Sequence, residues 1–503
     1  MSAGPIFVRR SGYAAFLTAC TAAAIMCALR LAYASPYASS WDAVDFALAL
    51  DRFDLLAMQP HFPGYPYFIL AATLVRSFVG DAVAALSAVS AIAYASAVVP
   101  MYRLVRATLP AWPAALAVVA MQGSAFMWLI ASQPMSEGMA VAALWWYLWS
   151  LHESLRSDRF FVRMAPALLF GLLMGIRVSY LPFGAGLLLL LQREWKRNGR
   201  LGPAALLMFI VSFQLLWIGA LAATEGSITG FSRLSFEFIR GHFTEWGGAA
   251  TADAGEPLPV RFVRLIAYNI LWAGLCGGNA WNAAAMGAML AASAAAMFVG
   301  RRTTAQQFNR LFRMKWLIIL FVLYFLWALF AQNVDKPRHI VPLIGITLWL
   351  TACFVYAVST GKRIIVRTTV ITTGLLALIL QLSAGLQLLL EQRNELPPTY
   401  QLHNHMERLG ANFILYTWEE TRVLHFLQAD YSHRRIHTYS LFLQEIEARP
   451  DETVYITGAV ADGFVSQGAE IEGHLVPVAE FSGNEMIEPV YHEIRLYEWK
   501  RQQ

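Results

Sequence analysis

Residues 41–66 read WDAVDFALALDRFDLLAMQPHFPGYP, and they place four aspartates and a histidine in one short stretch of a mostly apolar chain. Asp42 and Asp45 are three residues apart, so both carboxylates share one face if residues 41–56 form a helix that a preceding serine caps. Acidic side chains in a first helical turn also stabilise the helix by about 0.3–1 kcal/mol through its dipole, without any catalytic role. The stretch is therefore a candidate catalytic loop at a membrane face, with a purely structural explanation beside it.

The composition of the flanking chain is that of a membrane protein. Of the 503 residues, 57% are hydrophobic and only 14% are charged, against roughly 25% charged residues in globular proteins. The net charge of +5 does not indicate nucleic-acid binding, because the basic residues lie in short loops between apolar segments, where they orient a membrane protein. The four cysteines lack metal-binding spacing and are expected to be small buried side chains.

Apolar segments near the length of a bilayer crossing predict about 11 membrane spans, with a range of about 10–13. They cover residues 12–34, 82–102, 109–131, 134–151, 164–177, 180–192, 202–223, 279–299, 315–332, 338–358 and 366–390. Two further apolar segments, 63–79 and 263–278, are expected to lie along the outer interface. The expected fold is a polytopic α-helical membrane domain over residues 1–390, with outer loops at 35–80 and 224–278.

The charges between these spans are distributed unequally. The loops on one side carry only Glu153, Asp158 and Glu194 as acids. The cations of that side include Arg103, Arg106, Arg156, Arg159, Arg193, Lys196, Arg197, Arg301 and Arg302. The positive-inside rule places this side and the N-terminus in the cytoplasm, so the acidic loop and the C-terminal region face outward. Short loops and abundant alanine suggest a bacterial inner membrane.

Residues 391–503 differ in character from the rest of the chain. Helical patterns at 419–427 and 441–448 alternate with strand-like runs at 436–439, 453–457, 474–480 and 491–498. GAVADG at 458–463 follows a strand-like run but lacks the G-x-G-x-x-G spacing of a dinucleotide site. The sequence therefore predicts a small extracytoplasmic α/β domain of unassigned role.

The first outer loop resembles that of a known superfamily. SWDAVDF at 40–46 and QPHFPGYP at 59–66, directly after the first predicted span, are similar to the first outer loop of GT-C integral-membrane glycosyltransferases. The closest likeness is to protein O-mannosyltransferases and related bacterial enzymes. Asp42 matches the lead catalytic aspartate of that loop, and Asp45 matches the position three residues on, where an acid or histidine often occurs.

The second half of this loop matches with two departures. His61, Pro63 and Gly64 match a His-Pro-Pro-Gly element, but Phe62 replaces the first proline and no lysine follows Gly64. His61 and Tyr65 are candidate substrate-binding residues. The resemblance covers residues 1–200 and the later spans loosely, and it does not extend to the C-terminal region.

The resemblance implies transfer of a sugar from a polyprenyl-phosphate lipid to an acceptor glycan, lipid or protein outside the cytoplasm, with inversion at the anomeric carbon. A direct displacement needs a base for the acceptor, which a carboxylate such as Asp42 supplies. The departing phosphate needs nearby cations. Basic residues are therefore expected at the outer face, against the general charge bias.

Two groups of outer cations meet this expectation. Arg177 lies between the fifth and sixth predicted spans, and Lys336, Arg338 and His339 lie between the ninth and tenth. A lipid phosphate lies at the same depth. Arg177 and Arg338 are the stronger candidates because a guanidinium can bind phosphate through two parallel hydrogen bonds. Snorkelling from a helix end explains Arg177 equally well.

Glu137 is the third candidate catalytic residue, because an acid often stands at the outer start of this span in O-mannosyltransferase-like proteins. A first-turn acid after Pro134 also favours a helix start without chemistry. Arg240, His242 and Glu245 are secondary substrate-binding candidates, since carboxylates beside aromatic side chains suit a sugar site, although interfacial packing explains them too. No cofactor is required by the sequence, and a divalent metal ion held by carboxylates is possible.

Two other classes of protein remain open. A lipid or saccharide transporter or flippase would fit the number of spans, but it would place ionisable residues near the membrane midplane, whereas here they gather at helix ends. A non-catalytic membrane scaffold with a partner-binding tail leaves the acidic loop and the outer cations unexplained. No motif identifies the sugar or the acceptor.

Overall fold

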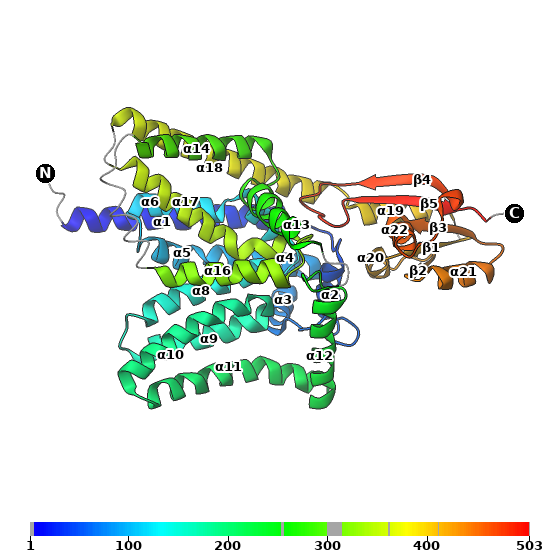
Figure 1. Ribbon diagram of the computed structural model, residues 1–503, viewed down its shortest axis with the longest axis horizontal. Coiled ribbons are helices and arrows are strands. Elements are labelled where there is room, and N and C mark those ends of the chain that lie inside the picture. Colours follow the sequence, from blue (N-terminus) through cyan, green and yellow to red (C-terminus); the bar gives the residue numbers. More distant parts are fainter. Residues whose placement is uncertain (1–4, 253–255, 299–313, 361–362, 411, 502–503) are drawn as a thin grey trace.

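The computed structural model describes residues 5–252, 256–298, 314–360, 363–410 and 412–501. A bundle of long helices occupies one part of the molecule, and a small α/β domain lies at one end of it (Figure 1). The N-terminus lies at the other end of the bundle, and the C-terminus lies in the α/β domain. Arg301 and Arg302, expected on the cytoplasmic side, lie outside the described residues.

Every predicted span falls on a helix or on two consecutive helices. These are α1 (Pro5–Ala32), α4 (Ala82–Ser96) with α5 (Val98–Val105), α6 (Ala111–Gln122) with α7 (Ala125–Ile130), α8 (Glu137–Ser154), α9 (Phe160–Ile176), η1 (Val178–Gly184) with α10 (Ala185–Asn198), α11 (Leu201–Thr224), α14 (Ala280–Phe298), α16 (Lys315–Ala331), η3 (Pro337–Ile340) with α17 (Val341–Ser359), and α18 (Ile364–Asn394). The helical content of the membrane domain therefore agrees with the sequence-based assignment.

Seven described segments are long and apolar enough to cross a membrane, so the chain is an integral membrane protein. One of them, Leu258–Leu275, overlaps the segment 263–278 that the charge pattern places at the interface. Shorter apolar helices, among them α9 and α16, lie beside the seven. The count of about 11 spans stays a prediction.

Helix α11 shows why these helices need a lipid environment. Its side chains Leu207, Met208, Val211, Leu215 and Leu216 are all about half exposed or more. An apolar surface of this kind along a whole helix is stable against acyl chains and unfavourable in water.

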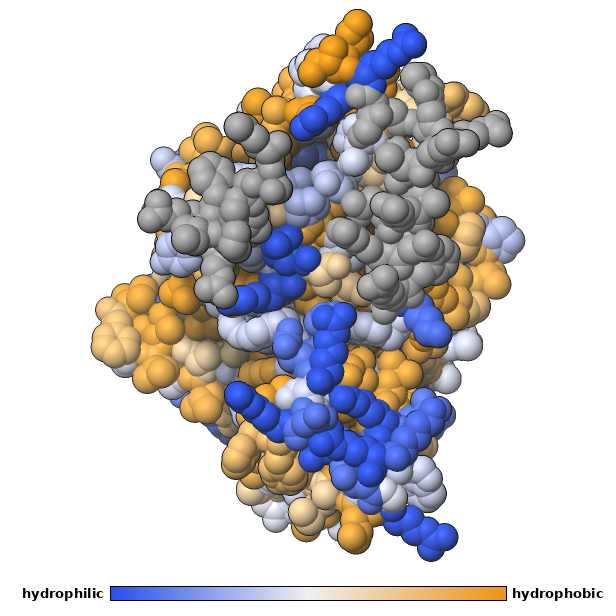
Figure 2. Space-filling model, turned by 90° about the vertical axis from the view of Figure 1, so that its left-hand side faces the viewer, coloured by the Kyte–Doolittle hydropathy of each residue, from blue (hydrophilic) through white to orange (hydrophobic). Residues whose placement is uncertain are grey.

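The end of the bundle opposite the α/β domain is polar. Figure 2 views this end and shows hydrophilic residues gathered in its lower half, where the ends of α8, α9, α10 and α11 lie. Arg159, Lys196 and Arg200 are exposed there. Arg163 forms an ion pair of 2.6 Å with Glu194, so one of the few acids of this end is already neutralised. This distribution agrees with a cytoplasmic location for this end.

Five further helical elements lie toward the end of the bundle that faces the α/β domain (Figure 1). They are α2 (Trp41–Ala49), α3 (Pro66–Val79), α12 (Ile228–Thr244), α13 (Leu258–Val263) and η2 (Arg264–Leu275). Ser40 caps α2, because its hydroxyl accepts a hydrogen bond from the backbone N–H of Ala43. The helix predicted over 41–56 ends at Ala49, and turns follow it, one of which the Asp54 carboxylate closes by accepting from the backbone N–H of Ala57 at 3.0 Å.

The C-terminal region forms one mixed sheet with helices on both faces. Its elements are α19 (Pro398–Arg408), β1 (Phe413–Thr417), α20 (Glu420–Phe426), β2 (Ser432–Arg435), α21 (Tyr439–Glu447), β3 (Thr453–Thr457), α22 (Gly458–Ser466), η4 (Glu472–His474), β4 (Leu475–Ser482) and β5 (Glu493–Trp499). The strand order is β2-β1-β3-β5-β4, and β1 is parallel to both β2 and β3. A small α/β domain is therefore present, and the predicted boundary at residue 390 falls inside α18, which ends at Asn394.

Two strands of this sheet differ from the sequence-based assignment. β1 was not predicted, because FILYT is buried throughout and shows no alternation. The strand predicted at 436–439 lies earlier, at β2, where Ser432 pairs with Ile414 of β1. β2 is an edge strand with an exposed, charged sequence, SHRR, and such a strand lacks an apolar signal.

Candidate active site

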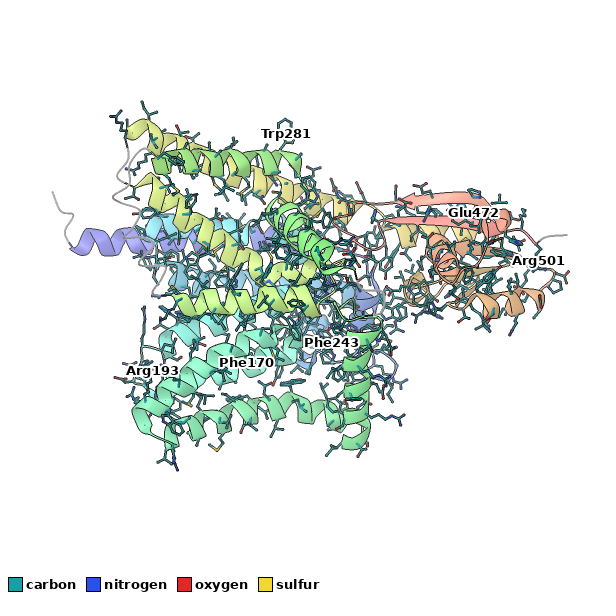
Figure 3. All side chains as sticks on the ribbon, in the orientation of Figure 1. Phe170, Arg193, Phe243, Trp281, Glu472 and Arg501 are labelled. Carbon is teal, nitrogen blue, oxygen red and sulfur yellow. The ribbon has the colours of Figure 1, made fainter. Side chains whose placement is uncertain are left out.

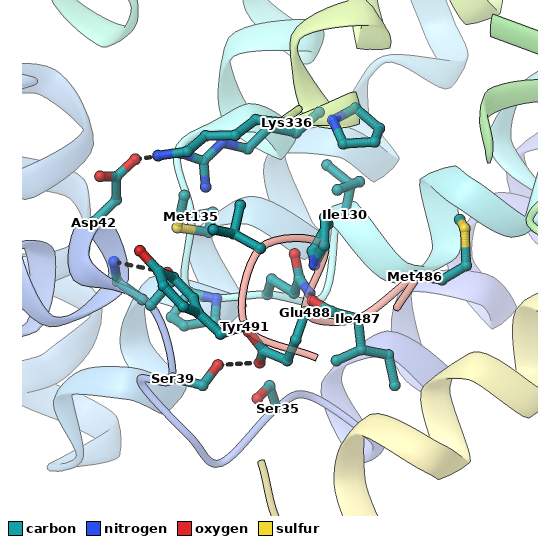
Figure 4. Close-up of a pocket in the computed structure, with 18 of the residues that line it drawn as sticks. Ser35, Ser39, Asp42, Ile130, Met135, Lys336, Met486, Ile487, Glu488 and Tyr491 are labelled. Carbon is teal, nitrogen blue, oxygen red and sulfur yellow. Dashed lines mark hydrogen bonds and ion pairs between the residues drawn. The ribbon is translucent and has the colours of Figure 1, made fainter. Parts of the chain in front are cut away.

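A small cavity lies where the bundle meets the α/β domain. Its volume is about 70 Å³, enough for a reacting group rather than a whole sugar. Segments far apart in the chain line it: residues 35–43 up to the first turn of α2, residues 130–135 from the end of α7, residues 336–338 at the start of η3, and residues 486–491 before β5. Figure 4 shows Asp42, Lys336, Glu488 and Tyr491 around this cavity.

Asp42 belongs to a network of two carboxylates and two guanidinium groups. Arg338 forms a hydrogen-bonded ion pair with Asp42, and its Nε lies 3.3 Å from Oε1 of Glu137. Arg177 lies 3.1 Å from the same Glu137 oxygen and donates a hydrogen bond of 2.9 Å to the Ser136 hydroxyl. Glu137 is fully buried, so it holds both arginines at the site. The structure thus brings together four residues that were predicted separately.

The start of α8 can occupy this position because Gly138 follows Glu137. A Cβ atom at Gly138 would lie 2.8 Å from the carbonyl oxygen of Ser90 in α4. The close approach of the two helices therefore requires a residue without a side chain, and it fixes the depth of Glu137.

The charge state of Asp42 follows from its neighbours. Partial burial raises the pKa of this carboxyl, but the Arg338 guanidinium, together with His61, Lys336 and Arg177, outweighs burial and holds the pKa well below its usual range. Asp42 is therefore a carboxylate at neutral pH. Its side chain keeps 24% of its accessible surface, so a ligand in the cavity can reach it.

Lys336 is a cation of this site whose ammonium group is free to bind an anionic ligand. It lines the cavity beside Asp42, and among the residues the structure describes it forms no ion pair. His339 follows Arg338 in η3, and the Nδ1 atom of its ring is buried without a hydrogen-bond partner in the described parts of the chain. Both predicted phosphate contacts therefore lie on the same short segment as Arg338.

Asp45 lies in a second, separate network. Its side chain is fully buried, with Oδ2 at 2.9 Å from Nδ1 of His61 and Oδ1 accepting from Nε of Arg422 at 2.8 Å. Nε2 of His61 lies 3.0 Å from the Tyr65 hydroxyl. Burial raises the pKa of Asp45, with the hydrogen bond from His61 and the charge of Arg422 acting in the opposite direction. This network ties α2 to the loop after it and to the α/β domain.

Sequence reasoning missed the contribution of the C-terminal region. Arg422 in α20 reaches Asp45 and also donates to the Met58 carbonyl at 2.9 Å. Glu488 lines the cavity and accepts a hydrogen bond from the Ser39 hydroxyl (Figure 4). Burial raises the pKa of Glu488 to about 7, although Ser39 and Arg338 oppose the shift. No pattern in the sequence connects these residues to the first loop, because only the tertiary fold brings them there.

The secondary substrate-binding candidates belong to neither network. Arg240 and His242 lie on α12, and Glu245 directly follows it. Nε2 of His242 lies 2.7 Å from the Ala331 carbonyl oxygen, which anchors α12 to α16. Arg240 and Glu245 are exposed, and neither forms an ion pair with another described residue. Within the described ranges, no group of three or more His, Cys, Asp or Glu side chains is placed to hold a metal ion.

Comparisons with known proteins place this geometry in a structural class. Neither the known protein-family models nor the curated proteins match the chain. Solved structures do match. The crystal structure of ArnT from Cupriavidus metallidurans bound to undecaprenyl phosphate aligns with a TM-score of 0.53 at 11% identity, over 96% of this chain and 99% of that chain. The fold is that of a GT-C membrane glycosyltransferase.

A second GT-C structure gives the same result. The apo oligosaccharyltransferase of Archaeoglobus fulgidus aligns with a TM-score of 0.50 at 11% identity, over 98% of this chain and 75% of that chain. At this identity the GT-C likeness concerns the fold, and it confirms the fold expected from the first outer loop. The alignment with ArnT also extends beyond the expected region, since 96% coverage includes most of the C-terminal domain.

Proposed function

We propose that this chain is a glycosyltransferase that moves a sugar from a polyprenyl-phosphate donor to an acceptor outside the cytoplasm. One observation carries the proposal: a carboxylate, Asp42, and two cations, Arg338 and Lys336, share one small cavity at the outer end of an apolar helical bundle. This arrangement positions a base and a phosphate-binding group for one displacement reaction. The structure of ArnT with undecaprenyl phosphate supports a donor of this class.

The reaction is a direct displacement at the anomeric carbon. The acceptor hydroxyl loses its proton to the Asp42 carboxylate while its oxygen forms the new bond to carbon. The bond from that carbon to the phosphate oxygen breaks, and the phosphate leaves with the electron pair. Arg338 and Lys336 stabilise the negative charge that develops on the leaving phosphate.

Arg338 connects the two halves of this reaction. Without a donor it is held by Asp42 and Glu137. A donor phosphate competes with Asp42 for the Arg338 guanidinium. When Arg338 binds the phosphate, the carboxylate loses the partner that holds its pKa low. Donor binding thus makes Asp42 a better base. Glu137 keeps Arg338 and Arg177 in position throughout.

An apolar groove next to this network suits the polyprenyl chain. Its cavity has a volume of about 840 Å³, and side chains of α9, η1, α10, α11, α12 and α16 line it. Phe170 and Phe243, labelled in Figure 3, belong to its lining. Arg177 directly precedes η1, so a chain in this groove would have its phosphate end near the arginines.

Replacement of Asp42 by asparagine tests the proposal. Asp42→Asn should preserve insertion and fold and lower turnover by about 100-fold or more, the usual contribution of a positioned base. The measurement is release of polyprenyl phosphate from radiolabelled polyprenyl-phosphate sugars by the purified full chain in lipid, with a cell-envelope fraction as acceptor.

Asp51→Asn is the matched control, because Asp51 lies in the same loop on the surface, where its ion pair with Arg76 contributes little. That variant should retain turnover to within about twofold. Near-normal turnover of the Asp42→Asn variant would remove Asp42 from the mechanism and shift attention to Glu488.

A further inference from the structure

The α/β domain turns its topological switch point toward the membrane site. The chain leaves β1 through α20 to reach β2, and it leaves β3 through α22, on the opposite side of β1 in the sheet. α20 packs with α19 on one face of the sheet, whereas α22 packs with α21 on the other. In open α/β sheets, ligands bind in the crevice where such connections diverge beyond the carboxyl ends of the strands.

A cavity of about 350 Å³ occupies this crevice, which is within the usual range of about 300–1,000 Å³ for small-molecule sites. Trp418 and Glu419 follow β1, and Asp462 follows the start of α22. The membrane domain contributes the remaining wall, with Trp246, Asp335 and Lys336.

This crevice adjoins the small cavity beside Asp42. Lys336, Val490 and Tyr491 line both spaces. A ligand of several units can therefore rest in the larger space and extend one group into the smaller one. The smaller space alone is too narrow for such a ligand.

The chemistry of the lining identifies a class of ligand. Asp335 forms an ion pair with Arg264, and Asp462 forms one of 3.0 Å with Arg495. Glu419 is a partly buried carboxylate of this crevice that has no ion-pair partner among the described residues. It lies close enough to Lys336 and Asp42 to feel both charges, and burial raises its pKa.

Two aromatic side chains complete this lining. Trp246 is 54% exposed, and the Tyr491 hydroxyl is buried without a partner in the described parts of the chain. A free carboxylate accepts hydrogen bonds from hydroxyl groups, a tyrosine hydroxyl donates one, and an indole face packs on C–H groups. A ligand with many hydroxyls and an apolar ring face has these features. The excess of acids disfavours an anionic ligand.

We propose that this crevice binds the acceptor of the transfer, that the acceptor is a saccharide, and that Glu419 holds one of its hydroxyls while another enters the cavity beside Asp42. The inference rests on the proposed function and specifies its acceptor. In this arrangement Glu419 is a positioning residue, because Asp42 receives the proton.

Glu419→Gln tests this site in kinetic terms. The full chain in lipid is given undecaprenyl-phosphate hexoses and pentoses as donors and defined oligosaccharides of hexose, pentose and N-acetylhexosamine units as acceptors. Loss of a hydrogen bond to a charged group should raise the acceptor KM about tenfold or more and leave the donor KM unchanged. Trp246→Ala should also raise the acceptor KM and leave the donor KM unchanged. Glu472→Gln is the matched control, since Glu472 lies on the same domain away from the bundle (Figure 3).

Saccharide binding without donor separates this inference from the proposed function. Saturation-transfer NMR titrations should give the same Kd for these oligosaccharides on the wild-type chain and on Glu472→Gln, and a Kd about tenfold or more higher on Glu419→Gln. If saccharides bind in this pattern and no sugar is ever transferred, the proposed function fails and the site stands. The site is overturned if the wild-type chain binds no saccharide, if an envelope peptide occupies the crevice instead, or if Glu419→Gln changes only the donor KM.

Discussion

Arg338 would act on both substrates of the transfer. It contacts Asp42, the proposed base for the acceptor, and it lines the cavity proposed to hold the donor phosphate. Arg338→Ala should raise the donor KM, lower kcat, or do both, by roughly 2–4 kcal/mol in total if the contact is shielded from water. Arg338→Lys should recover only part of the loss, since an ammonium cannot form two parallel hydrogen bonds. Initial rates over a range of donor concentrations measure the effect.

The pH dependence of the Arg338→Ala variant is a second readout. Removal of the guanidinium removes the charge that lowers the pKa of Asp42, so this pKa rises in the variant. A base must be deprotonated, and kcat/KM for the donor, which reports the free enzyme, should therefore begin to fall at a higher pH than in the wild-type chain as pH decreases. Unchanged donor kinetics with a changed acceptor KM would instead place the acceptor beside Arg338.

The sequence marked these residues as candidates, and their roles stay predictions, but it did not predict which of them pair. Asp42, Glu137, Arg177 and Arg338 each stood out as a charged residue at an outer helix end. Arg338 and Asp42 are separated by 296 positions, and no local pattern encodes a contact at that distance. The sequence made Asp45 a second catalytic candidate beside Asp42, and it did not predict that Asp45 contacts His61 and Arg422.

At the scale of secondary structure, the contact between α2 and α20 joins the first loop to the C-terminal domain. Arg422→Ala would leave the buried Asp45 with His61 as its remaining side-chain partner among the described residues, and loss of one partner from a buried pair costs roughly 3–5 kcal/mol. Thermal unfolding in detergent should show a lower midpoint. Protease digestion should cut residues 50–58 faster, because Arg422 also holds the Met58 carbonyl.

A double-mutant cycle separates this contact from general damage. Asp45→Asn combined with Arg422→Ala should cost less than the sum of the two single changes, because the second change removes a charge that the first has left unpaired. Arg434→Ala is the control, since its ion pair with Glu445 is largely exposed. Additive losses in the cycle would show that Arg422 and Asp45 do not act as a pair.

Elements with a regular apolar pattern were predictable, and elements defined by their partners were not. The spans and β3, β4 and β5 appear in the sequence as long or alternating apolar runs. β1 is buried on both sides and β2 is a charged edge strand, so neither alternates. The helix predicted over 41–56 gives way after Ala49 to turns, one of which Asp54 closes with its own backbone neighbours.

At the scale of the whole molecule, the two ends of the bundle differ in charge, and this difference predicts its orientation. The α/β domain should face the exterior or periplasm, because the exposed Arg and Lys residues of the opposite end mark the cytoplasmic side. In a chain whose native cysteines are replaced, a cysteine at Ser482 should react with a membrane-impermeant maleimide in intact cells. A cysteine at Ser157 should be protected, and labelling at Ser157 with protection at Ser482 would reverse the orientation.

The cavity beside Asp42 is built from both extremes of the chain, residues 35–43 and residues 486–491. Chains fold from the N-terminus as they are synthesised. When synthesis of the bundle is complete, the apolar groove is therefore present, but the cavity beside Asp42 still lacks the wall formed by residues 486–491. Under the proposed function, we expect a chain that stops before residue 486 to lack this wall of the cavity and to transfer no sugar. The translocation of residues 486–491 across the membrane is then the step that completes the proposed active site.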